Sequence, residues 1–218
     1  MSLATPAPAS AIASRSFRFY LAAIVLGTLA IQMQTVAIAW QVYRLTKDEG
    51  ANAALALGAI GLAEVIPFVS AVLFAGHVAD TNNRRRIAIG ALIAMTAVGL
   101  FLFLPEHLSE RWAQLTVIYG VIILGGLARS FLTTARQAII AEILPRDLIP
   151  SAVRWRNTLF ELACVIGPGM AGLLLWLGGE PLTYGLMLSC FVGSLVATSL
   201  LKPTQLLQSR TPEPILQS

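Results

Sequence analysis

Four ionisable side chains lie within long apolar stretches of this sequence: Glu64, Arg129, Arg136 and Glu161. A charged group at the centre of a membrane helix costs at least about 2.5 kcal/mol on insertion scales, so each of these residues needs a compensating role. Arg129 and Glu161 lie at similar depth in consecutive apolar stretches, which predicts an ion pair between them. Such a pair would act either as a structural salt bridge or directly on a substrate or a proton.

Glu64 lies near the middle of another apolar stretch, three residues before Pro67. No cation in a neighbouring stretch matches its depth. Burial penalises the charged form of a carboxyl group, so an unpaired Glu64 is expected to hold a proton at neutral pH. This predicts either a proton-coupling role or a neutral acid that is hydrogen-bonded to a neighbouring helix.

Two amides, Gln32 and Gln34, interrupt the first apolar stretch. With helical spacing, Gln32 shares a face with Thr28 and Thr35, whereas Gln34 points away from them. Groups of this kind either join helices by hydrogen bonds or line an aqueous cavity. The amides therefore extend the candidate substrate or proton pathway, which comprises Gln32, Gln34, Glu64, Arg129 and Glu161.

The elements that must position these residues are six apolar stretches. The chain has 218 residues, of which 56% are hydrophobic and 12% are charged, whereas soluble domains average about 25% charged residues. About 20 apolar residues span a bilayer, and the stretches cover residues 19–42, 54–79, 87–104, 113–140, 155–177 and 182–201. The first is too long for the apolar core of a signal peptide. The sequence thus predicts an all-α membrane protein with six transmembrane helices.

Lys and Arg residues are distributed unequally between the two sides of these stretches. Three lie on one side, at Arg44, Lys47 and Arg111. Arg129 is within a stretch, and all the others lie on the other side or at helix ends facing it. By the positive-inside rule, both termini are cytoplasmic and the protein is expected in the inner (plasma) membrane. The predicted division is a mobile cytoplasmic tail at 1–16, a transmembrane domain at 17–202, and a second tail or linker at 203–218.

Several classes of function are disfavoured. The net charge of +4 is spread over loops and forms no basic face, so no nucleic-acid partner is expected. Short loops leave no room for a soluble catalytic domain, and intramembrane proteolysis would need a serine–histidine pair or two aspartates at membrane depth. The two cysteines and two histidines show no metal-ligand spacing. We expect no enzyme activity, no cofactor and no metal.

A short charged loop separates the second and third stretches. Gly76 and Asp80 precede three consecutive cations, Arg84, Arg85 and Arg86. This pattern resembles the cytoplasmic motif A of the major facilitator superfamily. The motif usually has Arg at the position of Thr81 and Gly at that of Asn83. Asn adopts the left-handed backbone more readily than other non-glycine residues, which would preserve the turn.

Three further stretches support this resemblance. Residues 34–46 and 126–145, the latter with Arg136 and Glu142 as a cytoplasmic charge network, are similar to the enterobactin-exporter-like branch. Gly167-Pro168 with Gly172 is similar to the Gly-Pro motif in the fifth helix of exporters. The resemblance covers about residues 17–202, which is one half of the length of that family.

The resemblance implies the N-terminal six-helix half of a proton-coupled exporter of small amphipathic molecules, siderophores or drugs, that works by alternating access. Asp80 would then lock a helix of the other half, with Arg84 to Arg86 completing the latch. The expected partners are membrane lipid, a small-molecule substrate and a second six-helix half. The chain could be a fragment, a half-size protein that pairs with another chain, or a homodimer. A non-transporting membrane scaffold or partner subunit is the alternative.

Overall fold

The computed structural model describes residues 11–201, and the side chains of Glu49, Asp80 and Arg146 lie outside that description. Within the described residues the chain is helical and contains no strand. Most of the predicted tail at 1–16 and the whole of 203–218 fall outside the described residues.

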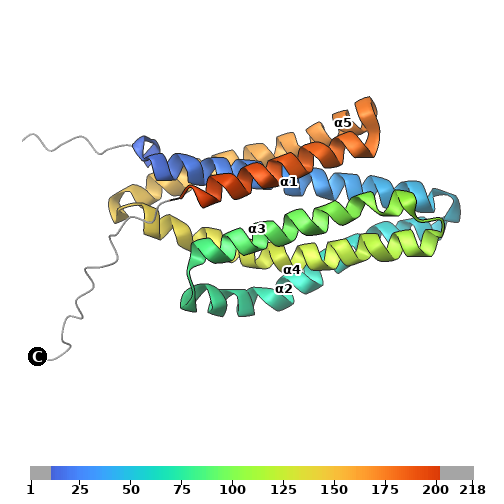
Figure 1. Cartoon of the computed structure of the whole chain (residues 1–218), viewed down its shortest axis with the longest axis horizontal. Helices are drawn as coiled ribbons and strands as arrows, with labels where there is room; N and C mark the ends of the chain where they lie inside the picture. The colour runs from blue at the N-terminus through green and yellow to red at the C-terminus, as the bar shows by residue number, and fades with distance from the viewer. Residues whose placement is uncertain (1–10, 202–218) are drawn as a thin grey trace, which may run out of the picture.

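Five long helices lie side by side in the bundle (Figure 1). Each is long and apolar enough to cross a membrane, the third when the turns that follow it to His107 are included. Their bounds are α1 (Arg15–Thr46), α2 (Ala51–Thr81), α3 (Arg84–Leu100), α4 (Arg111–Ile143) and α5 (Ile149–Ser199). Short 3-10 turns lie before and between them: η1 (Ala11–Ala13), η2 (Lys47–Glu49), η3 (Phe101–Phe103), η4 (Pro105–His107) and η5 (Arg146–Leu148).

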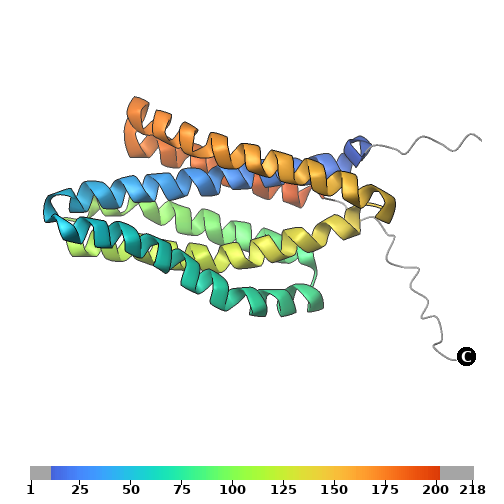
Figure 2. The ribbon, with the colours of Figure 1, turned by 180° about the vertical axis from the view of Figure 1, so that it is seen from behind.

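The last helix, α5, is 51 residues long and is broken at Gly179. This glycine has φ 70° and ψ −161°, a left-handed conformation that glycine adopts without the steric cost of a Cβ. The chain reverses there, so that the two arms of α5 run back along each other (Figures 1 and 2). The break falls between the predicted stretches 155–177 and 182–201.

The most buried helix is α1, which packs against both arms of α5. Large side chains such as Phe17, Met33 and Val42 are completely buried on it. By contrast, α2 packs mainly on α4 and exposes much of its apolar surface, including Leu73, which is 85% exposed. The face of α2 that points away from α4 is therefore an exposed apolar surface at one side of the bundle.

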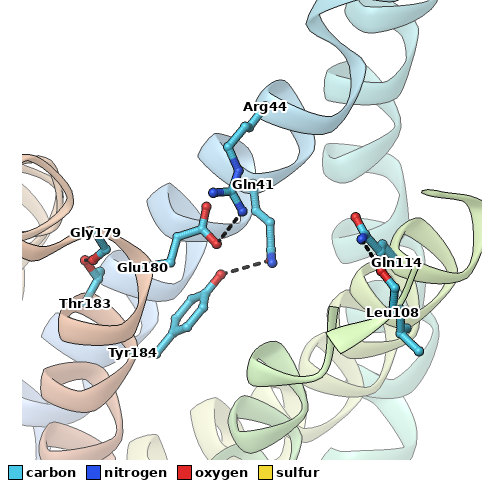
Figure 3. A network of polar contacts seen from close by, with 8 residues as sticks. All are labelled: Gln41, Arg44, Leu108, Gln114, Gly179, Glu180, Thr183 and Tyr184. Carbon is cyan, nitrogen blue, oxygen red and sulfur yellow. Dashed lines mark hydrogen bonds and ion pairs between the residues drawn. The ribbon is translucent and has the colours of Figure 1, made fainter. Parts of the chain in front are cut away.

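Polar contacts lie at the end of the bundle where α1 is followed by α2 (Figure 3), and the loop between α2 and α3 lies at the other end (Figure 1). Arg44 at the end of α1 forms an ion pair of 3.0 Å with Glu180, which begins the second arm of α5. One turn later, the Tyr184 hydroxyl donates a hydrogen bond of 2.9 Å to Gln41 Oε1. These two contacts fix the start of the second arm against α1.

Candidate functional site

An ion pair between Glu64 of α2 and Arg129 of α4 lies within the helical bundle. Arg129 Nη1 donates to Glu64 Oε1, and both side chains are half-buried. The predicted pairing of Arg129 with Glu161 is therefore wrong. Glu161 is exposed and forms no ion pair among the described residues. The inference that no cation matches the depth of Glu64 is also wrong, because α4 packs on α2 rather than on α5.

A glycine brings these two helices together. Gly126 lies one turn before Arg129 on α4, and a Cβ built there would be 2.8 Å from the backbone oxygen of Glu64. No other residue type fits such a backbone approach without a shift of the helices. On α2, Pro67 follows Glu64 by one turn, and it has no N–H to donate to the carbonyl one turn earlier. Gly126 thus places Arg129 within reach of Glu64.

The ion pair separates two cavities. The larger has a volume of about 410 Å³ and the smaller about 40 Å³. Glu64, Arg129 and Ile31 line both of them. A change in the Glu64–Arg129 contact would therefore alter the wall between the two spaces.

The amides predicted from the sequence line these cavities. Gln32 lines the larger one, and its Nε2 donates a hydrogen bond of 3.4 Å to the backbone oxygen of Cys164 in the first arm of α5. Gln34 is buried and lines the smaller one. Thr28 shares the larger cavity with Gln32, whereas Thr35 lies at the smaller one with Gln34. The predicted common face is therefore divided between the two spaces.

The two members of the predicted cytoplasmic charge network, Arg136 and Glu142, contact different groups. Arg136 Nη2 donates to the backbone oxygen of Ala23 at 2.8 Å and to Ser194 Oγ at 2.9 Å. The guanidinium thus ties α4 to α1 and to the second arm of α5. Glu142 instead forms an ion pair of 3.3 Å with Arg84.

Two of the three consecutive arginines of the charged loop, Arg84 and Arg85, bind the ends of different helices. Arg84 binds the end of α4 through Glu142 and through the backbone oxygen of Ala138 at 3.3 Å. Arg85 donates to the last carbonyls of α5, those of Thr198, at 3.3 Å, and Ser199. A helix C-terminus carries partial negative charge, which favours a cation there. Both arginines therefore join helices of this same chain.

The turn before them differs from the expected left-handed backbone. Asn83 has φ −67° and caps α3, its Oδ1 accepting a hydrogen bond of 3.2 Å from the Arg86 backbone N–H. A capping Asn satisfies one of the unpaired donors at a helix start. The side chain of Asp80 lies outside the described residues, and a Cβ at Gly76 would meet open space. The predicted latch to another half stays a prediction.

Within the Gly167-Pro168 motif, Gly167 marks a close contact between α5 and α1. A Cβ at Gly167 would be 2.6 Å from the Cβ of Gln32, so only glycine fits there without movement. Pro168 lies in the interior of the first arm, and Gly172 has open space beside it. Within this motif, Gly167 therefore sets the approach of this arm to the wall of the larger cavity.

Sequence reasoning missed three residues of this region: Gly126, Ser194 and Arg156. Arg156 lines the larger cavity. In the sequence it counts only among the basic residues on the cytoplasmic side, which serve as topology signals. Gly126 lies on the same face of α4 as Arg129, and that spacing was the available signal. No sequence signal marked Ser194, because its hydrogen-bond partner Arg136 is distant in sequence.

The sequence was compared with known protein families and with characterised proteins. A family model described as transmembrane secretion effector matches residues 6–218. The staphyloferrin A transporter of Staphylococcus aureus is 24% identical over 163 residues, covering 73% of this chain and 39% of that protein. Macrolide efflux protein A of Streptococcus pyogenes is 22% identical over 145 residues, covering 66% of this chain and 35% of that protein. The matched stretch thus spans well under half the length of these relatives.

Proposed function

Because this chain belongs to the transmembrane secretion effector family of the major facilitator superfamily, we propose that it forms the N-terminal six-helix half of a secondary active transporter. The two arms of α5 serve as the fifth and sixth spans. Both termini are cytoplasmic, and the protein lies in the inner (plasma) membrane. The cargo is a small amphipathic molecule that is exported in exchange for protons. The names of two relatives, a staphyloferrin A transporter and a macrolide efflux protein, support this class of cargo.

The observation that carries this proposal is the Glu64–Arg129 ion pair between the two cavities. A proton delivered to Glu64 would remove its charge and weaken its attraction to Arg129. The wall between the cavities would then loosen, which couples proton movement to access. Gln32 and Gln34 provide hydrogen-bonding groups on either side of that wall. Glu161, exposed on α5, remains a candidate for the pathway.

A second six-helix half would cover the exposed surfaces of α2 and of the first arm of α5. These surfaces include Leu73 and Phe74 on α2, and Val165 and Trp176 on α5, all more than half exposed. Alternating access would then consist of rocking of one half against the other. The second half could belong to the same protein, to a separate chain, or to a second copy.

Transport is tested in proteoliposomes that contain the purified chain, with and without its candidate second half. An imposed proton gradient should drive accumulation of radiolabelled amphipathic compounds beyond that of empty liposomes. A protonophore and Glu64→Gln should each abolish the accumulation, whereas Glu110→Gln, an exposed residue before α4, should not. Accumulation that is insensitive to both treatments would contradict proton coupling. No accumulation of any compound by an assembled complex would favour the scaffold alternative.

Topology is tested separately by cysteine labelling. In a variant with Cys164 and Cys190 replaced by alanine, single cysteines are introduced at Asn82, Asp48 and Ser109. A membrane-impermeant maleimide added to intact cells should label the Asp48 and Ser109 positions and leave the Asn82 position unlabelled. Labelling at Asn82 from outside would contradict the proposed orientation.

A further inference from the structure

Within the described residues, two guanidinium groups at the larger cavity donate hydrogen bonds to neutral groups. Arg136 contacts the backbone oxygen of Ala23 and the Ser194 hydroxyl. Arg156, on the first arm of α5, donates from Nη1 to the Asn157 side-chain oxygen at 3.3 Å. Both arginines line the cavity and are close enough to interact electrostatically. The hydrogen bonds of both guanidinium groups within the described part of the chain thus include no carboxylate.

No described carboxylate neutralises this pair. The acid that lines the cavity, Glu64, is already paired with Arg129. Glu142 is paired with Arg84, and Glu161 is exposed and does not line the cavity. Among the described residues, Arg136 and Arg156 therefore have no carboxylate partner at the cavity.

One donor of this pair is also unused. Arg156 Nε is shielded from solvent and has no hydrogen-bond partner among the described residues. A buried polar group without a partner is rare in native proteins and calls for an explanation such as a bound ion. A guanidinium presents several donors in one plane, which match the oxygens of a carboxylate or a phosphate.

The remaining wall of the cavity is largely apolar. Phe68 of α2 and Phe160 of α5 line it, together with aliphatic side chains of α1, α2 and α4. Its volume of about 410 Å³ lies within the usual range for small-molecule sites. The cavity thus combines a cationic region with an aromatic and aliphatic one.

We propose that the larger cavity binds an amphipathic organic anion, whose acidic group contacts Arg136 and Arg156 and whose apolar body lies against Phe68 and Phe160. The inference that this ligand is transported rests on the proposed function, whereas the inference that it binds in the cavity does not. A free organic acid and the headgroup of an anionic lipid share the required chemistry.

The test uses the purified chain in nanodiscs of phosphatidylcholine, which has no net charge. Equilibrium binding of radiolabelled 1-naphthoate is compared with that of uncharged 1-naphthylmethanol, which has the same ring system. Hydrogen bonds to charged groups should make naphthoate bind about tenfold more tightly. Higher salt should weaken naphthoate binding alone, and this comparison requires no variant. Equal binding of the two compounds at all salt concentrations would overturn the proposal.

Single substitutions test which arginine binds the anion. Arg156→Gln should weaken naphthoate binding about tenfold and leave naphthylmethanol binding unchanged, and Arg156→Lys should retain part of the affinity. The matched control is Arg154→Gln, because Arg154 is exposed on the same helix and does not line the cavity. Arg136 is left intact, because it joins three helices. An unchanged naphthoate affinity in a folded Arg156→Gln variant would overturn the assignment.

A second arm distinguishes the source of the anion. Nanodiscs that contain phosphatidylglycerol should bind less naphthoate if the lipid headgroup occupies the site, and the same amount if the ligand is a free solute. Either result supports an anion site and identifies its occupant. Binding of naphthoate without its transport would retain this site and count against the proposed function. Transport of other compounds without naphthoate binding would support the proposed function and count against this anion site.

Discussion

Arg129 of α4 pairs with Glu64 of α2, and the pair forms part of the boundary between a large and a small cavity. The two residues are 65 positions apart in sequence. Their contact depends on the close approach of the two helix backbones at Gly126. The pair thus links the packing of α2 on α4 to the shape of the space beside it.

A double-mutant cycle tests this pairing. Arg129→Gln leaves Glu64 without its counter-charge, and Glu64→Gln leaves Arg129 without one, so each single variant should lower thermal stability in nanodiscs. The double variant should lose less than the sum, with a coupling energy of about 0.5–3 kcal/mol, as for residues in contact. The control is the cycle of Arg129→Gln with Glu161→Gln, for which we expect no coupling. A larger coupling with Glu161 than with Glu64 would contradict the observed pair.

The sequence predicts where the helices lie along the chain better than it predicts which helices pack against each other. Apolar stretches and charged loops located the long helices, and the gap between 155–177 and 182–201 coincides with the break at Gly179. Depth along a helix can be estimated by counting residues from its end, and that count matches Arg129 with Glu161. Which helix faces which depends on packing around the bundle axis. Because α4 packs against α2 and α3 and has little contact with α5, sequence adjacency was misleading.

The contacts of Arg136 and Arg84 show the same limit. Both residues were recognised as charged groups near one end of the bundle, but their partners are backbone carbonyls, a serine and Glu142. Carbonyls occur at every residue, so no sequence pattern marks the ones that accept. Glycine positions are more informative, because a Cβ at Gly126 or Gly167 would clash with the neighbouring helix.

Enlarging Gly126 should separate α4 from α2. In Gly126→Ala, the new Cβ would be 2.8 Å from the Glu64 oxygen, and overpacking of this kind typically costs about 1–3 kcal/mol. The matched control is Gly120→Ala on the same helix, where a Cβ meets open space. There, loss of chain entropy in the unfolded state should leave stability equal or raise it by up to about 1 kcal/mol. Thermal unfolding in nanodiscs measures both, and equal effects would contradict the close approach.

Arg85 should matter more to stability than Arg86. Arg85 donates to the C-terminal carbonyls of α5, and Arg85→Gln should cost about 1 kcal/mol through the lost interaction with the helix end. For the Arg86 guanidinium, the part of the chain that the structure describes offers no hydrogen bond or ion pair. Arg86→Gln is therefore the control, with an expected change within about 0.5 kcal/mol. The thermal unfolding midpoints of the two variants are compared. A larger loss of stability in Arg86→Gln would show that the contact of Arg85 with α5 is dispensable.

Arg44 and Glu180 provide a final test at the opposite end of the bundle (Figure 3). The Glu180 side chain is only 3% exposed, whereas Arg44 is half exposed. Arg44→Gln should therefore cost about 1–3 kcal/mol, because it leaves a buried carboxyl group with weaker compensation. Glu180→Gln should cost less, because the arginine that loses its partner can reach water. The control is Lys47→Gln, an exposed residue of the same turn. If thermal unfolding gives the opposite order, with Glu180→Gln the more damaging, burial of the carboxyl group does not set the cost.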